Sequence, residues 1–199
     1  MKNLIKGSFT PILLGISLLI SPFSGIYAAD QASSLHQQTL RKELTSEDIH
    51  KLIIAAPVMQ QTMKQLNPPK PDQSYRSELL EATFAGRIHS KVAGLLQGSK
   101  YLDALDSKAK EYGYSEYMEY AHHADSASAV MLIDSFVRTS YKFKHPDLEF
   151  ENLWEHMYNP STPEQNRIKL QGWMDEMLEK RHLSRQSTEL VYRHFAELK

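Results

Sequence analysis

The sequence predicts an all-α protein, an irregular bundle of six or seven helices with no sheet. Three observations favour this class. Apolar residues recur at spacings of three and four along every long segment, the period of an amphipathic helix. Runs in which apolar and polar residues alternate strictly between turn residues, as in a half-buried strand, do not recur along the chain. The dipeptides Asn-Gly and Asp-Gly, typical of tight hairpins, do not occur.

The composition is that of an ordinary globular chain. Of the 199 residues, 41% are hydrophobic, 24% charged and 10% aromatic, which excludes a disordered tail protein, a collagen and a coiled-coil rod. The chain has no cysteine. A disulfide framework, a cysteine-ligated metal, a thiol nucleophile and a lipidated N-terminal cysteine are therefore all excluded.

Residues 1–29 have the organisation of a cleavable secretory signal peptide. Lys2 and Lys6 precede an apolar stretch at 12–20, and the small residues of 27–29 offer a cleavage site. The alternative, an uncleaved anchor, is disfavoured because the apolar stretch is short for a span of about 20 residues. No second run of membrane length follows. We expect a periplasmic or secreted protein without stable membrane insertion after cleavage.

The mature chain is divided into a flexible N-terminal tail, 30–43, and a single helical domain, 44–199. Removing Lys2 and Lys6 from the 23 basic residues leaves 21 against 24 acidic ones, a net charge of −3. With no basic field to attract phosphates, nucleic acid is not expected as a partner.

The first helix is predicted from Thr45 or Ser46, either of which can cap it, to Leu66. Pro57 lies inside this segment and removes a backbone donor, so a kink or a break is expected there. Residues 67–72 contain three prolines and form a stiff connector.

Two helices and the centre of the bundle follow. One stripe is closed by Gly98-Ser99 and consists of Leu80, Phe84, Ile88, Val92, Leu95 and Leu96. The next helix, 101–112, ends at Gly113, because glycine suits a left-handed C-terminal position. Ser115 then caps a long segment, 116–141, that is apolar around so much of its circumference that we expect the central helix here.

The remaining segments predict three helices. One restarts at Pro146 and stops at Asn159-Pro160. A second starts at Thr162-Pro163-Glu164-Gln165, where Thr162 is expected to cap it. Its expected buried side consists of Ile168, Trp173, Met174, Met177 and Leu178. The last helix, capped by Ser184 or Ser187, extends to Leu198.

Two Glu-x-x-His pairs raise the question of a metal site, because such pairs on two helices help to build di-iron bundles. The pairs are Glu47 with His50 and Glu119 with His122. Both lie in the first turns of their helices, beside the apolar stripe, where ligands would face water. No metal site is expected.

The sequence His122-His123-x-Asp125 could serve a metal or a phosphohydrolase, since imidazole and carboxylate suit zinc, iron or nickel. Adjacent residues, however, point about 100° apart on a helix. We interpret these residues as a solvated helix face.

Catalysis has no positive support. Nucleophile elbows, glycine-rich phosphate loops and zinc helices are absent from the sequence. No catalytic residue and no cofactor are therefore expected.

A concentration of tyrosines is the least ordinary feature. Six residues are candidates for a contact surface: Tyr112, Tyr114, Tyr117, Tyr120, His122 and His123. Tyrosine joins a large apolar body to a polar tip, which suits contacts with a protein, peptide or glycan. The alternative is that Tyr114 staples across the Gly113 turn and the other rings pack beneath the central helix.

Three segments carry a resemblance to a known group. The first is Leu44-Thr45-x-Glu47-x-Ile49-x-Lys51-Leu52-Ile53 leading to Pro57. The second extends from Leu102-Asp103-x-Leu105 to Gly113-Tyr114-Ser115-x-Tyr117-x-Glu119-Tyr120, and the third is the helical pair near the C-terminus. In these the chain resembles a loose group of small exported proteobacterial proteins without assigned function. The resemblance implies export and helices but supplies no functional residue. The proline-rich connector and the adjacent histidines are not part of that pattern.

These observations favour an exported helical protein that binds an envelope or extracellular protein, or a small ligand held between helices. The first alternative is a hydrolytic enzyme acting on envelope polymers or host material, with Glu or His as acid or base. The second is a periplasmic stress chaperone, which would expose a large apolar surface.

Overall fold

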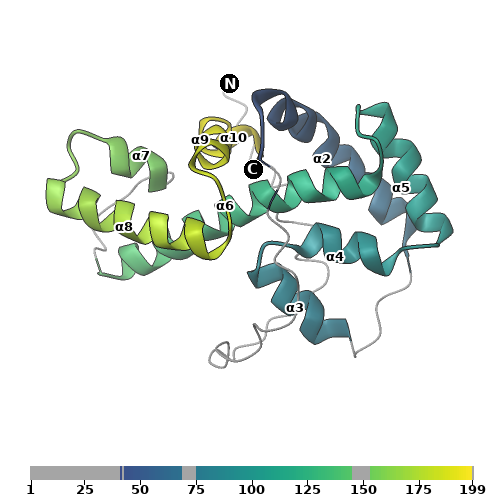
Figure 1. The fold of residues 1–199 in the computed structure, drawn as a ribbon, viewed down its shortest axis with the longest axis horizontal. Coiled ribbons are helices and arrows are strands. Elements are labelled where there is room, and N and C mark those ends of the chain that lie inside the picture. Colours follow the sequence, from purple (N-terminus) through teal and green to yellow (C-terminus); the bar gives the residue numbers. More distant parts are fainter. Residues whose placement is uncertain (1–40, 42, 69–74, 145–152, 199) are drawn as a thin grey trace, which may run out of the picture.

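The computed structural model describes residues 41, 43–68, 75–144 and 153–198. Within these ranges the chain forms nine α-helices and no strand, which confirms the all-α class (Figure 1). The predicted signal peptide and most of the predicted tail lie outside the described residues. So do the greater part of the proline-rich connector and Pro146.

Helix α6, Tyr117–Lys144, is the axis of the bundle. Helices α2, Ser46–Leu66, and α9, Arg185–Arg193, lie on one side of it, and α4, Ile88–Leu95, lies on the other (Figure 1). Every residue from 120 to 131 except His122 is buried. The expectation of a central helix is confirmed, because neighbours cover α6 on almost all sides over this stretch.

Helix α2 begins where the sequence predicts. Thr45 and Asp48 form a reciprocal capping box, and Asn67 ends the helix with a left-handed φ of 43°. Of the predicted kink or break at Pro57, the break is wrong, since α2 continues through this residue. Pro57 is exposed.

The segment predicted as one helix over 80–96 consists of two. Helix α3, Arg76–Phe84, ends before Gly86, and α4 begins at Ile88. Gly86 has a φ of +64°, and a Cβ added to it would lie 2.7 Å from the Cβ of Ala129 on α6. The chain therefore turns where its backbone approaches α6 too closely for any side chain.

The predicted ends of α5, Lys100–Glu111, are confirmed. The Ser99 side chain accepts the amide of Leu102 at its start, and Gly113 follows its end with a φ of +83°. Figure 1 shows α5 beside the amino-terminal part of α6.

The carboxyl-terminal helices differ from expectation in detail. Helix α7, Leu153–Tyr158, stops before Asn159-Pro160 as predicted, and α8 spans Glu164–Lys180. The Thr162 hydroxyl does not cap α8 but donates to the carbonyl of His156. The side of α8 that faces the core carries Leu170, Met174 and Leu178, whereas Ile168 is exposed, contrary to prediction.

The final segment also divides. Ser184 caps α9 as predicted, through the amide of Ser187. A short helix α10, Phe195–Leu198, follows after His194.

Candidate functional site

The six residues predicted as a contact surface lie mostly in the interior. Tyr114, Tyr117, Tyr120 and His123 are at most 4% exposed. Tyr112 is half-buried, and only the His122 side chain is at the surface. The rings of Tyr114, Tyr117 and Tyr120 are not presented to solvent, because α2 and α5 pack on this part of α6. A binding role for these residues stays a prediction.

The buried rings form one contiguous aromatic cluster. The Tyr114 ring meets the rings of Tyr120 and His123 edge-on, with centroids 5.5 and 5.4 Å apart. Tyr117 stacks on Tyr120 at 5.5 Å, and His89 from α4 approaches Tyr120 edge-on at 6.5 Å. These are the offset and T-shaped arrangements that aromatic quadrupoles favour, so the packing alternative describes this cluster.

Burial also fixes the protonation of the tyrosines. Desolvation raises the pKa of Tyr114, Tyr117 and Tyr120 well above the usual range of a phenol. All three hold their protons near neutral pH. They are poor general bases.

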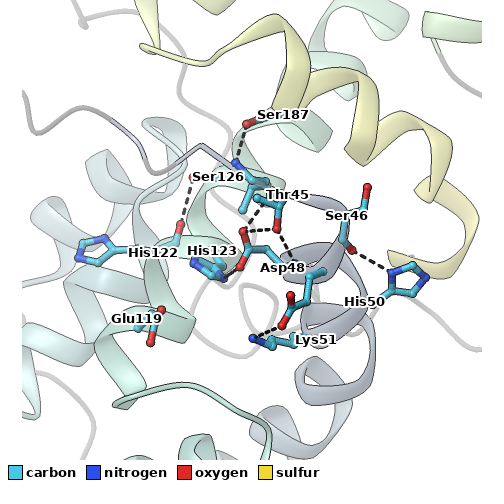
Figure 2. A network of polar contacts seen from close by, with 12 residues as sticks. Thr45, Ser46, Asp48, His50, Lys51, Glu119, His122, His123, Ser126 and Ser187 are labelled. Carbon is cyan, nitrogen blue, oxygen red and sulfur yellow. Dashed lines mark hydrogen bonds and ion pairs between the residues drawn. The ribbon is translucent and has the colours of Figure 1, made fainter.

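Asp48 lies at the centre of the polar network next to this cluster (Figure 2). Its Oδ2 accepts the amide and the hydroxyl of Thr45, at 2.9 and 2.8 Å. Its Oδ1 lies 3.6 Å from Nδ1 of His123, and Figure 2 shows that imidazole pointing from α6 toward α2. One carboxylate thus caps α2 and contacts the buried imidazole of the central helix.

Residues 122–125 do not form the solvated face that the sequence was interpreted to give. His122 is exposed, but His123 and Asp125 are buried. The Asp125 carboxylate accepts the amides of His89 and Ser90 at 2.8 and 3.0 Å, together with the Ser90 hydroxyl. It therefore caps α4 from another helix, and α4 has no side-chain cap of its own.

Two further carboxylates act in the same way. Asp134, fully buried on α6, accepts the first amide of α7 at 2.5 Å. Asp106 on α5 accepts the amide of Tyr117, the first residue of α6, at 2.7 Å. These three caps could not be predicted from local sequence, because each comes from another helix. Asp125 and Asp134 carry a signal, since both are acids in a segment whose apolar residues predict burial.

The two Glu-x-x-His pairs are occupied by local contacts. Glu47 pairs with Lys51, and the His50 ring contacts the carbonyl of Ser46. Glu119 accepts the amide and hydroxyl of Ser115. In the described residues no group of three or more His, Asp or Glu side chains could hold a metal ion.

Arg41 makes contacts that no sequence pattern predicted. Its Nε donates to the carbonyl of Arg181 at 3.0 Å, and its Nη1 donates to those of Gly86 and Asp125 at 2.7 and 3.1 Å. Its Nη2 donates to the carbonyl of Ala85. Burial lowers the pKa of this guanidinium to about 10. Arg41, in the segment expected to be flexible, thus fastens the chain to three parts of the bundle.

Large apolar side chains are exposed on α3 and α6, and two of them, Leu80 and Phe84, belong to the stripe that the sequence predicts to be buried. Leu80 and Phe84 on α3 are 43% and 66% exposed, and Phe136 on α6 is 61% exposed. Leu80 and Phe84 share one face of α3, four residues apart. Phe136 is seven residues beyond Ala129, on which the α3–α4 turn rests, and so faces the same side of α6 as that turn. We call these three side chains the α3–α6 apolar surface.

Comparisons with known protein families, with characterised proteins and with solved structures find no match to this chain. None of the helices in the described ranges combines the length and apolar character that a membrane span requires.

Proposed function

We propose that this chain is an exported helical protein that acts by binding another protein of the envelope or the extracellular medium. The α3–α6 apolar surface is the observation that carries the proposal. Leu80 and Phe84 on α3 and Phe136 on α6 are exposed large apolar side chains, and α6 buries most of its other apolar residues. Exposed apolar groups that gather on one side of a domain often mark an interaction site.

The hydrolytic alternative has less support. Burial raises the pKa of the phenols of Tyr114 and Tyr117 and lowers the pKa of the imidazoles of His89 and His156, because it penalises the charged form. Structural packing accounts for these shifts without any reacting group. The six residues 112, 114, 117, 120, 122 and 123 remain a weaker candidate surface, since only Tyr112 and His122 reach solvent.

Photocrosslinking in cells that export the protein tests the proposal. A benzoylphenylalanine replaces Phe84 or Phe136 in the full chain, and a matched control places it at Ile54, which is 60% exposed on α2. We expect the same discrete adduct from positions 84 and 136, in the envelope or the medium, and none from position 54.

A second measurement tests export. The intact mass of the exported chain should correspond to a protein without the residues before Asp30.

Other results would contradict the proposal. Absence of an adduct at positions 84 and 136, or an identical adduct at position 54, removes the α3–α6 apolar surface as the binding site. A ladder of many adducts that grows under unfolding stress favours the chaperone alternative instead, because a chaperone contacts many clients.

A further inference from the structure

Two histidines from near the two ends of the described chain meet at the surface of the bundle. His50 lies on α2, and His194 is the C-cap of α9, directly before α10. Their ring centres are 5.2 Å apart, and the ring planes are inclined by 67°. Helices α9 and α10 both pack against α2, and Figure 2 shows the His50 ring beside the yellow carboxyl-terminal segment. The fold therefore brings together two imidazoles that lie far apart in the sequence.

The hydrogen bonds of each ring decide which nitrogen carries a lone pair. Nδ1 of His50 lies 2.9 Å from the carbonyl oxygen of Ser46, and Nδ1 of His194 lies 2.9 Å from Oε1 of Glu197. A carbonyl and an ionised carboxylate only accept hydrogen bonds, so Nδ1 holds the proton of each neutral imidazole. Nε2 is then the nitrogen that can bind a metal ion.

This arrangement is typical of histidines that bind metals. A ligating imidazole donates its other N–H to a carboxylate or a backbone carbonyl, which fixes the ring and makes the ligating nitrogen more basic. Here His194 has the carboxylate and His50 has the carbonyl. The local contacts of both rings therefore prepare their Nε2 atoms as ligands.

The spacing of the two rings fits one tetrahedral ion. Two imidazoles that bind zinc at about 2.1 Å and at the tetrahedral angle have their centres about 5.2 Å apart. At the right angle of a square-planar copper ion, the centres would be about 4.5 Å apart. The observed distance of 5.2 Å matches the tetrahedral value. Because His50 is exposed, its ring can adjust to an ion without displacing a core side chain.

The charges around this pair favour a cation. His194 follows the last turn of α9, and the carboxyl end of a helix carries partial negative charge. Glu197 adds a carboxylate at the same place, while the neighbouring Arg193 is paired with Glu189. The chain has no cysteine, so imidazole is the softest strong ligand that it can offer to zinc.

We propose that His50 and His194 bind one Zn²⁺ ion through their Nε2 atoms. Since no group of three or more His, Asp or Glu in the described part of the chain could hold a metal, water fills the remaining positions. The ion joins α2 to the carboxyl-terminal helices and so stabilises the contact between the two ends of the domain. This site differs from a di-iron centre, because Glu47 takes no part in it and pairs with Lys51. It is also independent of the α3–α6 apolar surface.

Zinc titration of the exported chain, prepared without a histidine tag, tests the proposal. Calorimetry with zinc chloride should show saturable binding. At a zinc concentration a hundred times Kd, the melting temperature should rise by about 5 °C or more. In long-range proton–nitrogen NMR spectra, the Nε2 signals of His50 and His194 should shift or broaden together, whereas those of His122 should not.

Matched variants then assign the ion to this pair. We expect His50→Asn and His194→Asn each to weaken zinc binding by tenfold or more and to remove the zinc-dependent rise in melting temperature. His122→Asn is the control, because His122 is exposed and Figure 2 shows its ring pointing away from α2. This control should bind zinc as the unchanged chain does. Melting temperatures measured without zinc identify any variant that loses binding because it unfolds.

Four results would overturn the proposal. The first is binding that appears only above about 1 mM zinc. The second is an affinity that both His50→Asn and His194→Asn retain, and the third is an equal loss of affinity in His122→Asn. The fourth, which needs no variant, is zinc binding during which the NMR signals of His50 and His194 stay fixed. None of these results bears on the crosslinks at positions 84 and 136, which report on a different surface.

Discussion

Asp125 and Asp134 lie in two regions of α6, and both have buried carboxylates. Each carboxylate caps another helix, α4 in the amino-terminal half and α7 in the carboxyl-terminal half. Their other partners differ. Asp125 accepts only from the start of α4, by two amides and the Ser90 hydroxyl. Asp134 accepts one amide and the phenol of Tyr192, and it lies 3.6 Å from the guanidinium of Arg138.

The difference shows two ways of holding a negative charge inside a helical bundle. At Asp125 the dipole of α4 and its free amides stabilise the carboxylate. At Asp134 side chains share the task, and Arg138, a third exposed, keeps contact with water. Removing Asp125 therefore takes away the acceptor of the first turn of α4 and the acid that acts on Arg41, whereas removing Asp134 takes away the acceptor of one α7 amide and of the Tyr192 phenol.

The largest effect is expected from Asp125→Ala. It leaves the amides of His89 and Ser90 unsatisfied and removes the acid that faces Arg41, so the free energy of unfolding should fall by about 3–5 kcal/mol. Urea denaturation followed by circular dichroism measures this. Asp125→Asn, which keeps an acceptor, should recover part of the loss. A loss of stability smaller than that caused by Asp134→Ala would contradict this comparison.

Gly86→Ala should come next, because the α3–α4 turn rests on the amino-terminal half of α6 without room for a methyl group. Strain at positive φ and the clash with Ala129 together predict a loss of about 2–4 kcal/mol. Gly172→Ala on α8 is the matched control, since nothing lies within 4 Å of an added Cβ there. It should raise stability by about 0.5–1 kcal/mol. Thermal melts of both variants suffice, and equal shifts would refute the close approach.

Asp134→Ala should cost about 2–3 kcal/mol, because one amide and one phenol lose their acceptor while Arg138 can turn to solvent. Tyr192→Phe removes the phenol alone and should cost about 1 kcal/mol. Combining the two variants in a double-mutant cycle measures their coupling. Strictly additive losses would show that the Tyr192 hydrogen bond contributes nothing through Asp134.

The smallest effect concerns pH. Burial lowers the pKa of His89 near Asp125 and of His156 on α7, so the folded state resists protonation of both. Below pH 6.5 the unfolded chain binds these protons first. Stability should therefore decline as pH falls from 7 to 6, by at most about 0.7 kcal/mol for each histidine.

A change at Asp125 should distinguish the pKa of His89 from the pKa of His156. Its charge opposes the lowering at His89 and does not act on His156. In Asp125→Asn the pKa of His89 should fall further, whereas that of His156 should not move. Titration of the imidazole signals by NMR follows both sites. A His89 pKa that stays constant in this variant would show that Asp125 does not influence it.

Local signals predicted the elements that depend on neighbouring residues. Thr45 at the start of α2, Ser99 before α5 and Gly113 after it all do what their sequence context indicates. The break at Gly86 could not be predicted in this way. Leu80, Phe84 and Ile88 continue a helical spacing, and only the approach to Ala129 forces a turn.

The candidate site was less predictable than the fold. The spacing of Tyr114, Tyr117 and Tyr120 reveals a shared region but not which helices cover it, so burial could not be distinguished from presentation. The reverse held for Phe84, which the apolar stripe predicted to be buried and which is 66% exposed on α3. Arg41 gave no signal at all, because its partners are backbone carbonyls that carry no sequence identity.

The helix caps that are supplied by side chains of other helices have a consequence for the order of folding. Helix α4 has eight residues and no side-chain cap of its own, and its acceptor lies 35 positions later in the chain. So short a segment is not helical in isolation, because nucleation outweighs the few hydrogen bonds gained. Helix α6 must form and dock before α4 gains its first-turn partner. Changes at Asp125 should therefore act mainly on the unfolding rate, while changes within the core of α6 slow refolding.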